Sequence, residues 1–314
     1  MVNDMSQQRE GAKPYSVGFL KELSGKLGES TSRVQVVSKG DLVPLNPRPS
    51  LGGYIRELWR RRFFIGAEAR SKALRSTRDY RLWKLWLVVS PILDVAFYGL
   101  LFGLLFKTAR DVDNFVGYLF IGLIFMRMLT SMLGSGSGLI SSSKAMISAF
   151  PFPRASLVFS QTLRAAIDNL LPAGVALILA FVAQWGDFPT WTTILVVPLY
   201  VMLHLFGCGL MLIFARLTAE IPDVKALVPI ITQAWFFLSG VMFTMDRFSH
   251  VPTLQKIMVE NPAYEFLTAI RDVTIYGTVP ALDVWLILLV WTAGTFIVGF
   301  VYFWAAEEKY VRLA

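Results

Sequence analysis

Four ionisable side chains interrupt otherwise apolar stretches of the sequence, and they are the first candidates for chemistry. Asp94 and Arg127 fall within two separate stretches at comparable depth, and Arg164 and Asp168 share a third. Ionisable groups inside a membrane are costly, so they are candidates for function by default. Arg164 and Asp168 lie four residues apart and therefore share one helix face. We predict that Asp94 pairs with Arg127, and that each pair either fixes helix packing or serves the passage of a substrate.

Aromatic side chains are abundant in the same stretches and could offer flat faces to the apolar sides of sugars. The candidates for a sugar-lined passage are Tyr98, Phe102, Phe106, Trp235, Phe236 and Phe237. Membrane aromatics also form interfacial belts and packing contacts. The residues alone leave both interpretations open.

Signals for catalysis are weak. Glu220 and Asp223 form the only close acidic pair in an inner loop, and we expect the flanking Arg216 and Lys225 to neutralise them. The two histidines lack acidic or cysteine partners at metal-ligand spacing. Gly25 and Lys26 lack the glycine spacing before them and the Ser or Thr after them that a phosphate-binding P-loop requires. We therefore expect neither an enzyme nor a metal or cofactor site in this chain.

The elements that must position these residues are membrane helices. Of 314 residues, 55% are hydrophobic and 17% are charged, whereas soluble domains have about 25% charged residues. A helix of about 18 or more apolar residues can cross a bilayer. Stretches of this length are 86–106, 115–133, 157–183, 192–215, 226–245 and 284–306. Because they lack the alternation of barrel strands, we predict an all-α integral membrane protein with six spans.

Basic residues are concentrated ahead of the first stretch. Seventeen of the 30 Lys and Arg residues precede Leu85, and the positive-inside rule assigns such a segment to the cytoplasm. Six spans then place both termini inside, with these basic residues in outer loops: Lys107, Arg110, Arg247, Lys256 and Arg271. This distribution explains the net charge of +8 without a nucleic-acid partner. We predict a multi-pass protein of the cytoplasmic membrane, without a cleavable signal peptide.

The composition divides the chain into four parts. Residues 1–50 are polar, which is typical of a mobile cytoplasmic tail. Residues 51–84 combine aromatic side chains and arginines at helical spacing, which predicts an amphipathic interface helix against membrane lipids. Residues 85–306 form the transmembrane domain, and residues 307–314 are its cytoplasmic C-terminus.

Two loops are expected to contain short helices. In the first inner loop, a helix should end before Pro151, because the residue ahead of a proline resists the helical conformation. In the last outer segment, Asn261 and Pro262 predict a helix start, with an N-cap followed by proline at the first helical position. We expect one or two short helices over 252–278.

Three segments resemble the membrane subunits of type-2 ABC exporters. Residues 60–72 and 82–93 are similar to the basic interface helix and first span of that family, and residues 149–154 resemble its first coupling loop. Residues 216–277 resemble the subgroup that exports O-antigen, teichoic acid, capsule and other lipid-linked polysaccharides. The resemblance covers the chain from about Leu51 to the end. The chain departs from the family pattern at 82–84 and 239–241, which leaves the subfamily and the substrate open.

The resemblance implies a dimer of this chain and two copies of a separate ATPase that binds ATP and magnesium. It implies ATPase-coupling residues at Tyr54, Trp59, Lys144, Phe150, Pro151, Phe152, Pro153, Arg154, Pro222 and Asp223. It implies an outer gate at Asn261, Pro262, Tyr264 and Phe266. The expected substrate is a polyprenyl-diphosphate-linked glycan, such as a galactan or an O-antigen-like chain. Its diphosphate would meet Arg60, Arg61 and Arg62.

Other functions stay open on the sequence. The same fold could export a small lipid or drug. A membrane-bound glycosyl- or phosphotransferase would need clustered acidic metal ligands, and Glu220 with Asp223 is the nearest approach. A channel or secondary carrier would favour matched broken spans in two halves, which we do not find in the sequence.

Overall fold

The computed structural model describes residues 49–76, 83–105, 112, 114–184, 189–244 and 250–313. The predicted tail lies almost entirely outside these residues, as does Phe106 of the predicted passage. By its contacts the chain divides into Met1–Asn46 and Pro47–Ala314, and the second unit is the one described here. The described part of this unit is all-helical, with turns and no strand, as predicted.

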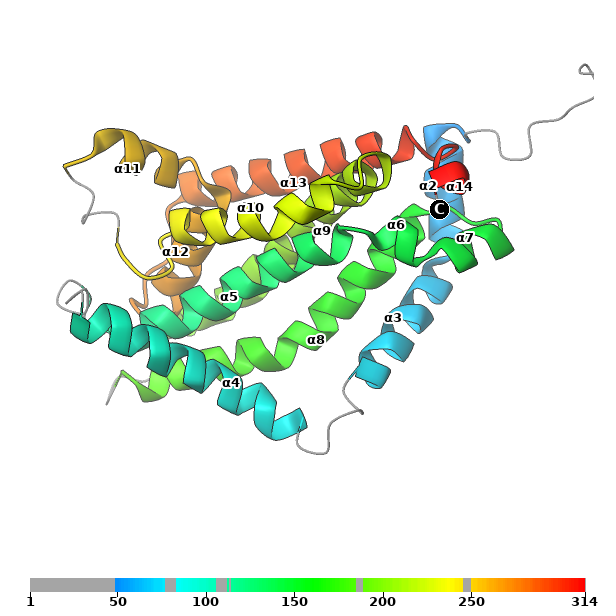
Figure 1. Cartoon of the computed structure of the whole chain (residues 1–314). Helices are drawn as coiled ribbons and strands as arrows, with labels where there is room; N and C mark the ends of the chain where they lie inside the picture. Colours follow the sequence, from blue (N-terminus) through cyan, green and yellow to red (C-terminus); the bar gives the residue numbers. More distant parts are fainter. Residues whose placement is uncertain are drawn as a thin grey trace, which may run out of the picture. The chain divides into compact units, whose positions relative to one another are not determined.

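Four helices in the described part are long and apolar enough to cross a membrane (Figure 1). They are α5 (Phe115–Gly136), α8 (Ala155–Val182), α9 (Val196–Glu220), which continues the 3-10 turn Trp191–Leu195, and α13 (Leu282–Trp304). Each overlaps a stretch that apolar length predicted. In lipid a single segment can satisfy its own backbone groups only as a helix, which is why length alone located them.

The first and fifth predicted spans are built differently. α4 (Trp83–Tyr98) continues into a π-helical segment, Gly99–Leu105. α10 (Val224–Leu238) has 15 residues and is followed by a turn in which Gly240 has a φ of +60°. The prediction of a helix over 226–245 is therefore wrong in its last third, because a positive φ ends a helix.

The two ends of the helix bundle carry different short helices (Figure 1). At one end, which we call the α2 end, lie α2 (Leu51–Arg60), α6 (Leu139–Ser142), α7 (Lys144–Ala149) and α14 (Tyr310–Leu313). At the other end, which we call the α12 end, lie α11 (Pro252–Val259) and α12 (Pro262–Thr274). From α2, α3 (Arg62–Ser76) packs along α8.

The short helices agree largely with the sequence predictions. α7 ends at Ala149, ahead of Pro151. Asn261 caps α12, because its side chain accepts a hydrogen bond from the Ala263 amide at 3.0 Å, and Pro262 takes a first-turn position. The interface segment differs from the prediction: two helices that join at Arg61 replace the single one expected.

The packing places α5 at the centre and uses glycines between α9 and α13. Almost all apolar side chains of α5 are buried, whereas Val290 of α13 is 70% exposed. A Cβ atom on Gly299 would lie 2.5 Å from the carbonyl oxygen of Gly209, and one on Gly209 would lie 2.6 Å from the Thr295 carbonyl group. Small residues allow membrane helices to approach this closely.

Candidate functional site

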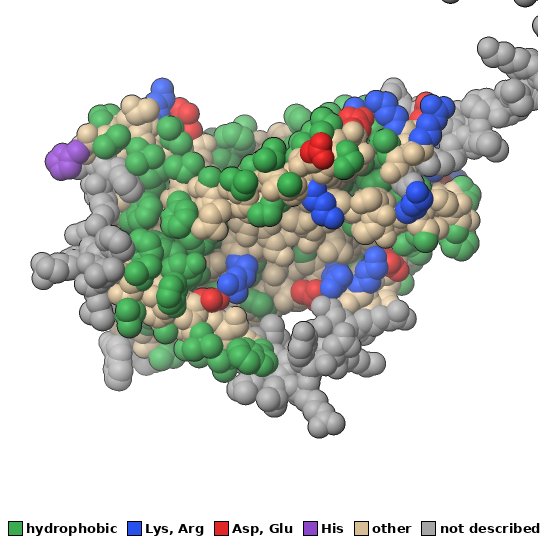
Figure 2. Space-filling view, in the orientation of Figure 1, with side chains coloured by type: hydrophobic (Ala, Val, Ile, Leu, Met, Phe, Trp, Pro, Cys, Tyr) green, Lys and Arg blue, Asp and Glu red, His purple; other side chains and the backbone are tan. Residues whose placement is uncertain are grey.

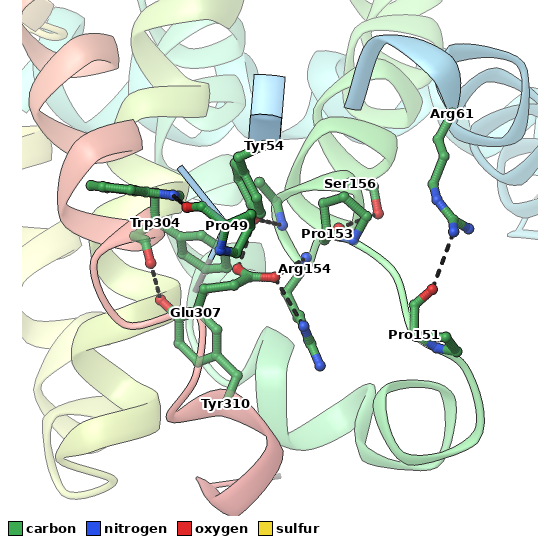
Figure 3. Close-up of polar contacts among 12 residues, drawn as sticks. Pro49, Tyr54, Arg61, Pro151, Pro153, Arg154, Ser156, Trp304, Glu307 and Tyr310 are labelled. Carbon is green, nitrogen blue, oxygen red and sulfur yellow. Dashed lines mark hydrogen bonds and ion pairs between the residues drawn. The ribbon is translucent and has the colours of Figure 1, made fainter. Parts of the chain in front are cut away.

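A buried polar network joins three distant segments at the α2 end (Figure 3). Glu307, just after α13, is 2% exposed and accepts hydrogen bonds from the Tyr54 hydroxyl at 2.7 Å and the Arg154 amide at 2.9 Å. The Arg154 guanidinium adds an ion pair at 3.2 Å. The Tyr54 hydroxyl in turn accepts a hydrogen bond from the Ala155 amide at 3.0 Å. The network therefore ties α2, the start of α8 and the end of α13 together.

Burial governs the ionisation of this network. Burial raises the pKa of the Glu307 carboxyl above its usual value, although the bonds from Arg154 and Tyr54 favour the charged form. Burial, followed by the nearby Glu307, holds the pKa of Tyr54 well above its usual value. Tyr54 therefore keeps its proton and remains a hydrogen-bond donor to the carboxylate.

The sequence analysis did not single out Glu307. An acid directly after the last apolar stretch is a signal, but Glu308 follows it and nothing in the sequence separates the two. The structure separates them, because Glu307 is buried and Glu308 is exposed.

The predicted ATPase-coupling residues divide into an exposed and a buried set. The exposed set is Trp59, Lys144, Phe150, Pro151, Pro222 and Asp223. The buried set is Tyr54, Phe152, Pro153 and Arg154. Buried residues cannot offer their side chains to a second protein, so these four can act only by positioning the exposed ones.

The second predicted coupling segment follows α9 at the same end. Glu220 forms ion pairs with Arg216 at 3.2 Å and with Lys309 at 3.1 Å. The neutralisation expected for Glu220 is thus present, with Lys309 as the second partner in place of the predicted Lys225. Asp223 is exposed, and the described residues contain no cluster of three or more potential metal ligands.

The three arginines expected at a diphosphate have different surroundings. Arg60 is exposed at the end of α2. Arg61 donates to the Pro151 carbonyl at 3.1 Å (Figure 3). It also donates to the carboxylate of Glu57, one helical turn earlier, at 2.9 Å. The Arg62 guanidinium lies 5.2 Å from the ring centre of Trp59. Arg61 therefore connects the α2–α3 junction to the loop before α8. Arg60 and Arg62, which are exposed, are better candidates than Arg61 for contact with a diphosphate.

Both predicted pairs of ionisable residues in the apolar stretches are present. Arg127 of α5 lies 2.7 Å from Asp94 of α4, joining nitrogen Nη2 to oxygen Oδ2. Arg164 and Asp168 of α8 lie 3.2 Å apart, joining Nε to Oδ2. The Arg127 side chain is 62% exposed, so the pair bridges α4 and α5 at a surface of the unit rather than in its core.

Aromatic residues of α4, of the π-helical segment Gly99–Leu105 and of α10 form a row. The Tyr98 ring centre lies 6.3 Å from that of Phe236 and 6.5 Å from that of Phe102. Phe236 lies 5.5 Å from Phe237, which is 43% exposed. This row, Phe102–Tyr98–Phe236–Phe237, brings together residues that are distant in the sequence.

Trp235 and the predicted gate residues link α10 to α12. The Trp235 indole donates to the Asn261 side-chain oxygen at 2.8 Å, and the Asn261 amide nitrogen donates to the last carbonyl of α10 at 3.1 Å. Asn261 and Phe266 are buried, whereas Pro262 and Tyr264 are half-buried. Trp235 thus contributes to packing at the α12 end rather than to the aromatic row.

Arg271 is a buried charge that the sequence analysis placed in an outer loop. It lies in α12, is 2% exposed, and donates to the carbonyls of Gly240 at 3.0 Å, Val241 at 3.1 Å and Tyr118 at 3.3 Å. Its guanidinium also lies 3.4 Å from the Tyr118 ring centre. Carbonyl oxygens replace the water that the charge has lost. The sequence did carry a signal, because Arg271 lies four residues after Leu267 on the apolar face of α12.

These features define a multi-pass helical membrane protein with a polar junction at one end and short packed helices at the other. The sequence model of the family described as ABC-2 type transporter matches residues 67–275. The chain therefore belongs to the ABC-2 type transporter family and is a protein of the cytoplasmic membrane.

Two similar proteins bear names from polysaccharide transport. The O-antigen export system permease protein RfbA of Myxococcus xanthus is 23% identical over 248 residues, which cover 77% of this chain and 94% of RfbA. The polysialic acid transport protein KpsM of Escherichia coli is 24% identical over 169 residues, which cover 53% of this chain and 64% of KpsM. The similarity to RfbA thus extends over most of both chains.

Proposed function

We propose that this chain is the membrane-spanning permease subunit of an ATP-driven exporter that moves a polysaccharide across the cytoplasmic membrane. Membership of the ABC-2 type transporter family supports the transport role over that of a membrane-bound transferase. The observation that carries the substrate class is the similarity to RfbA over 94% of that protein. KpsM, the other relative, is also named for transport of a polysaccharide.

The proposal includes six crossings, with both termini and the α2 end in the cytoplasm. The four long helices supply four crossings, and α4 and α10 would supply the others. The 15 residues of α10 span roughly 22 Å at 1.5 Å per residue, which is short of about 30 Å of hydrocarbon. The turn at 239–244 would complete that crossing. The exposed arginines of α2 support a cytoplasmic α2 end under the positive-inside rule.

We place two ATPase copies below a dimer of this chain, in contact with the α2 end, and they would bind the ATP and magnesium. The exposed Trp59 and Phe150 support this placement, being 70% and 64% exposed on neighbouring segments. The Glu307 network gives such contacts a route into the bundle. Because Glu307 bonds the start of α8 and α2 at once, a displaced loop would move α8 and α13 together.

The proposed substrate is a glycan linked to polyprenyl diphosphate, either a galactan or an O-antigen-like chain. Arg60 and Arg62 would meet the diphosphate, since paired arginine donors match phosphate oxygens. The exposed end of the row Phe102–Tyr98–Phe236–Phe237 would meet sugar rings. The half-buried Tyr264 and Pro262 would form part of the outer gate, held in place by Asn261 and Phe266.

The test is to co-express this chain with the ATPase encoded beside its gene, purify the complex, and measure ATP hydrolysis with and without lipid-linked glycans. A stable complex whose turnover responds to one glycan supports the exporter and identifies its substrate class. Failure to form a complex with any candidate ATPase contradicts it, and a response to small lipids or drugs alone contradicts the substrate class.

The diphosphate contact has its own test in the same assay. The double variant R60A/R62A should lose the response to lipid-linked glycan while ATP hydrolysis without glycan stays unchanged. The matched control is R70A, which removes an exposed arginine from α3. An unchanged glycan response in R60A/R62A would contradict the diphosphate role and leave the exporter intact.

A further inference from the structure

The proposed export function assigns no role to Arg271, the buried charge of α12. Its hydrogen bonds go to the backbone carbonyls of Tyr118, Gly240 and Val241. Tyr118 belongs to α5, whereas Gly240 and Val241 belong to the turn after α10. Because a backbone carbonyl moves only with its own segment, one guanidinium connects α12, which contains residues of the proposed outer gate, to two other segments.

The surface of α5 is shaped to receive this guanidinium. Tyr118 and Gly122 lie four residues apart and so share one face of α5. The Arg271 guanidinium lies 3.4 Å from the ring centre of Tyr118, and a Cβ atom on Gly122 would overlap its Nη2 atom. The glycine therefore leaves the space that the guanidinium fills, and the tyrosine ring covers it.

The turn after α10 is held along α12 rather than at one point. Asn261 caps the start of α12, and it donates to the Leu238 carbonyl at 3.1 Å and to the Ser239 hydroxyl at 3.0 Å. Arg271 lies in the last turn of α12. The 13 residues of α12 span roughly 20 Å at 1.5 Å per residue. Two attachments near opposite ends of α12 prevent the turn from rotating against this helix.

The same turn lies against a residue of the proposed outer gate. Gly240 has a φ of +60°, and a Cβ atom there would lie 2.8 Å from the Tyr264 ring. Tyr264 therefore packs directly on Gly240. The Gly240 carbonyl accepts hydrogen bonds from Arg271 at 3.0 Å and from the Tyr118 hydroxyl at 2.9 Å. A shift of this turn would therefore move Tyr264.

The body of α10 has fewer buried contacts in this unit than its end. Within α10, all of which the structure describes, Val228 alone is buried. Leu227 and Ile230 are 51% and 66% exposed, and hydrophobic side chains lie along α10 on the face shown in Figure 2. α10 begins directly after Pro222 and Asp223, which we propose to contact the ATPase. A displacement of this start would be carried along α10 to the turn.

We propose that Arg271 is a positioning residue for export, and that it makes α12 follow the end of α10. The proposal rests on the proposed export function and names the residue that links its ATPase contact to its outer gate. Motion that begins at Asp223 would reach the turn at Gly240, and Arg271 with Asn261 would pass it to α12. R271K would keep the charge, but one ammonium cannot replace a planar guanidinium, so the link should weaken.

The link can be tested by labelling a cysteine on α12 in the complex with its ATPase, reconstituted in lipid nanodiscs. Cys208 is the only cysteine and is 1% exposed, so C208A provides the background. T268C adds a single cysteine on the half-buried side of α12. The probe is a permanently charged methanethiosulfonate reagent. Its labelling rate is measured without nucleotide and with the ATPase trapped by ATP and vanadate.

Three variants are compared on this background: R271K, Y118F and N114A. Y118F keeps the ring beside the guanidinium and removes the hydroxyl that donates to the Gly240 carbonyl. N114A is the matched control, because Asn114 is 8% exposed, caps α5 and donates to the Ala180 carbonyl at 3.1 Å. It therefore removes buried hydrogen bonds that lie outside the link.

In the background protein we expect nucleotide trapping to change the labelling rate at least about fivefold, the lower end of typical coupling between distant sites. R271K should abolish most of this change while its complex traps as much nucleotide. Y118F should reduce the change, and N114A should retain it. A merely structural role of Arg271 would lower the yield of R271K and leave the change per folded complex intact, which would overturn the proposal.

If R271K gives no folded complex, Y118F decides, and a change equal to that of N114A overturns the link. A background protein that traps nucleotide without any change at T268C overturns it as well. ATP hydrolysis with lipid-linked glycan is measured on the same complexes. A normal glycan response with a full change in R271K and Y118F sinks the link alone, and a background complex without any glycan response sinks the export function.

Discussion

Two charged side chains, Arg271 and Glu307, are buried near opposite ends of the bundle and are satisfied in different ways. Arg271 donates to three backbone carbonyls, whereas Glu307 accepts from a tyrosine, an arginine and a backbone amide. A buried charge is tolerated only when its lost hydration is replaced. Each side chain therefore fixes the positions of the segments that supply its partners.

Replacement of Arg271 should destabilise the fold. R271A removes the Arg271 donor from three carbonyls, of which that of Gly240 keeps the Tyr118 hydroxyl as a donor at 2.9 Å. Hydrogen bonds to a charged group are worth roughly 1.5–3 kcal/mol each. R271K keeps the charge but cannot reach three carbonyls from one ammonium, so its loss should be smaller. We expect lower melting temperatures in thermal size-exclusion assays, with R271A the lowest. K256A is the control, since Lys256 is 78% exposed. An R271A protein that melts like K256A would show that the bonds from Arg271 to these carbonyls do not stabilise the fold.

The raised pKa of Glu307 should make stability depend on pH. The folded carboxyl holds its proton more tightly than the unfolded one, so the free energy of unfolding falls as pH rises from about 4.3 through the raised folded value. E307Q has no such proton and should lack this slope. The measurement is the melting temperature of both proteins across that pH range, with E308Q as the control on an exposed neighbour. Parallel curves for the wild type and E307Q would show that burial does not perturb this group.

At the scale of elements, helix contacts depend on two kinds of close approach. α9 and α13 meet through glycines, and α4 and α5 meet through the Asp94–Arg127 ion pair. The first contact excludes any added atom, whereas the second requires two complementary groups. These contacts respond differently to substitution and can be tested apart.

Enlarging the glycine contact should separate α9 from α13. G299V would put side-chain atoms where the Gly209 carbonyl oxygen lies, since even a Cβ would be 2.5 Å from it. G294V is the matched control in the same helix, because a Cβ there has no atom within 4 Å. We expect G299V to lower the yield of folded protein in detergent and G294V to leave it near that of the wild type. Equal yields from the two variants would argue against close packing at Gly299.

The ion pair between α4 and α5 should depend on complementarity rather than on which helix carries which charge. D94R and R127D each place two like charges together in a membrane helix pair, so each should reduce folded yield. The exchange D94R/R127D restores opposite charges and should recover much of that yield. Membrane expression and size-exclusion profiles provide the measurement, and a double variant as poor as the single ones would count against the pair as a packing element.

At the scale of the whole molecule, the unit exposes large aromatic side chains at one end and packs short helices together at the other. The α2 end exposes Trp59 and Phe150, while the α12 end buries Asn261, Phe266 and Arg271. Our proposals assign the α2 end to ATPase contact and the α12 end to the outer gate.

Removing an exposed ring from the α2 end should weaken ATPase binding. An aromatic anchor in an interface is worth roughly 2 kcal/mol or more, or about thirtyfold in Kd. We expect F150A to reduce co-purification of the ATPase and its glycan-dependent turnover. W191A is the matched control, because Trp191 is 72% exposed but belongs to the turn before α9 that packs against α12. If W191A weakens the complex as much as F150A does, the assignment of the ends is wrong.

The sequence by itself determined the elements whose cause is local. Apolar length predicted the membrane helices, because a single segment in lipid can satisfy its backbone groups only as a helix. Asn261 and Pro262 predicted the start of α12, because capping involves neighbouring residues alone. The spacing of Arg164 and Asp168 predicted their pair, since four residues make one helix face.

The tertiary structure decided what depends on contacts between distant residues. The end of α10 is set at a turn whose carbonyls bind Arg271, some thirty positions further on, so an apolar run continuing past Gly240 could not reveal it. Tyr54 and Glu307 are separated by 253 positions and meet only in the fold. Burial is a property of the packed chain, and a sequence pattern cannot show which of two adjacent acids, Glu307 or Glu308, packing removes from water.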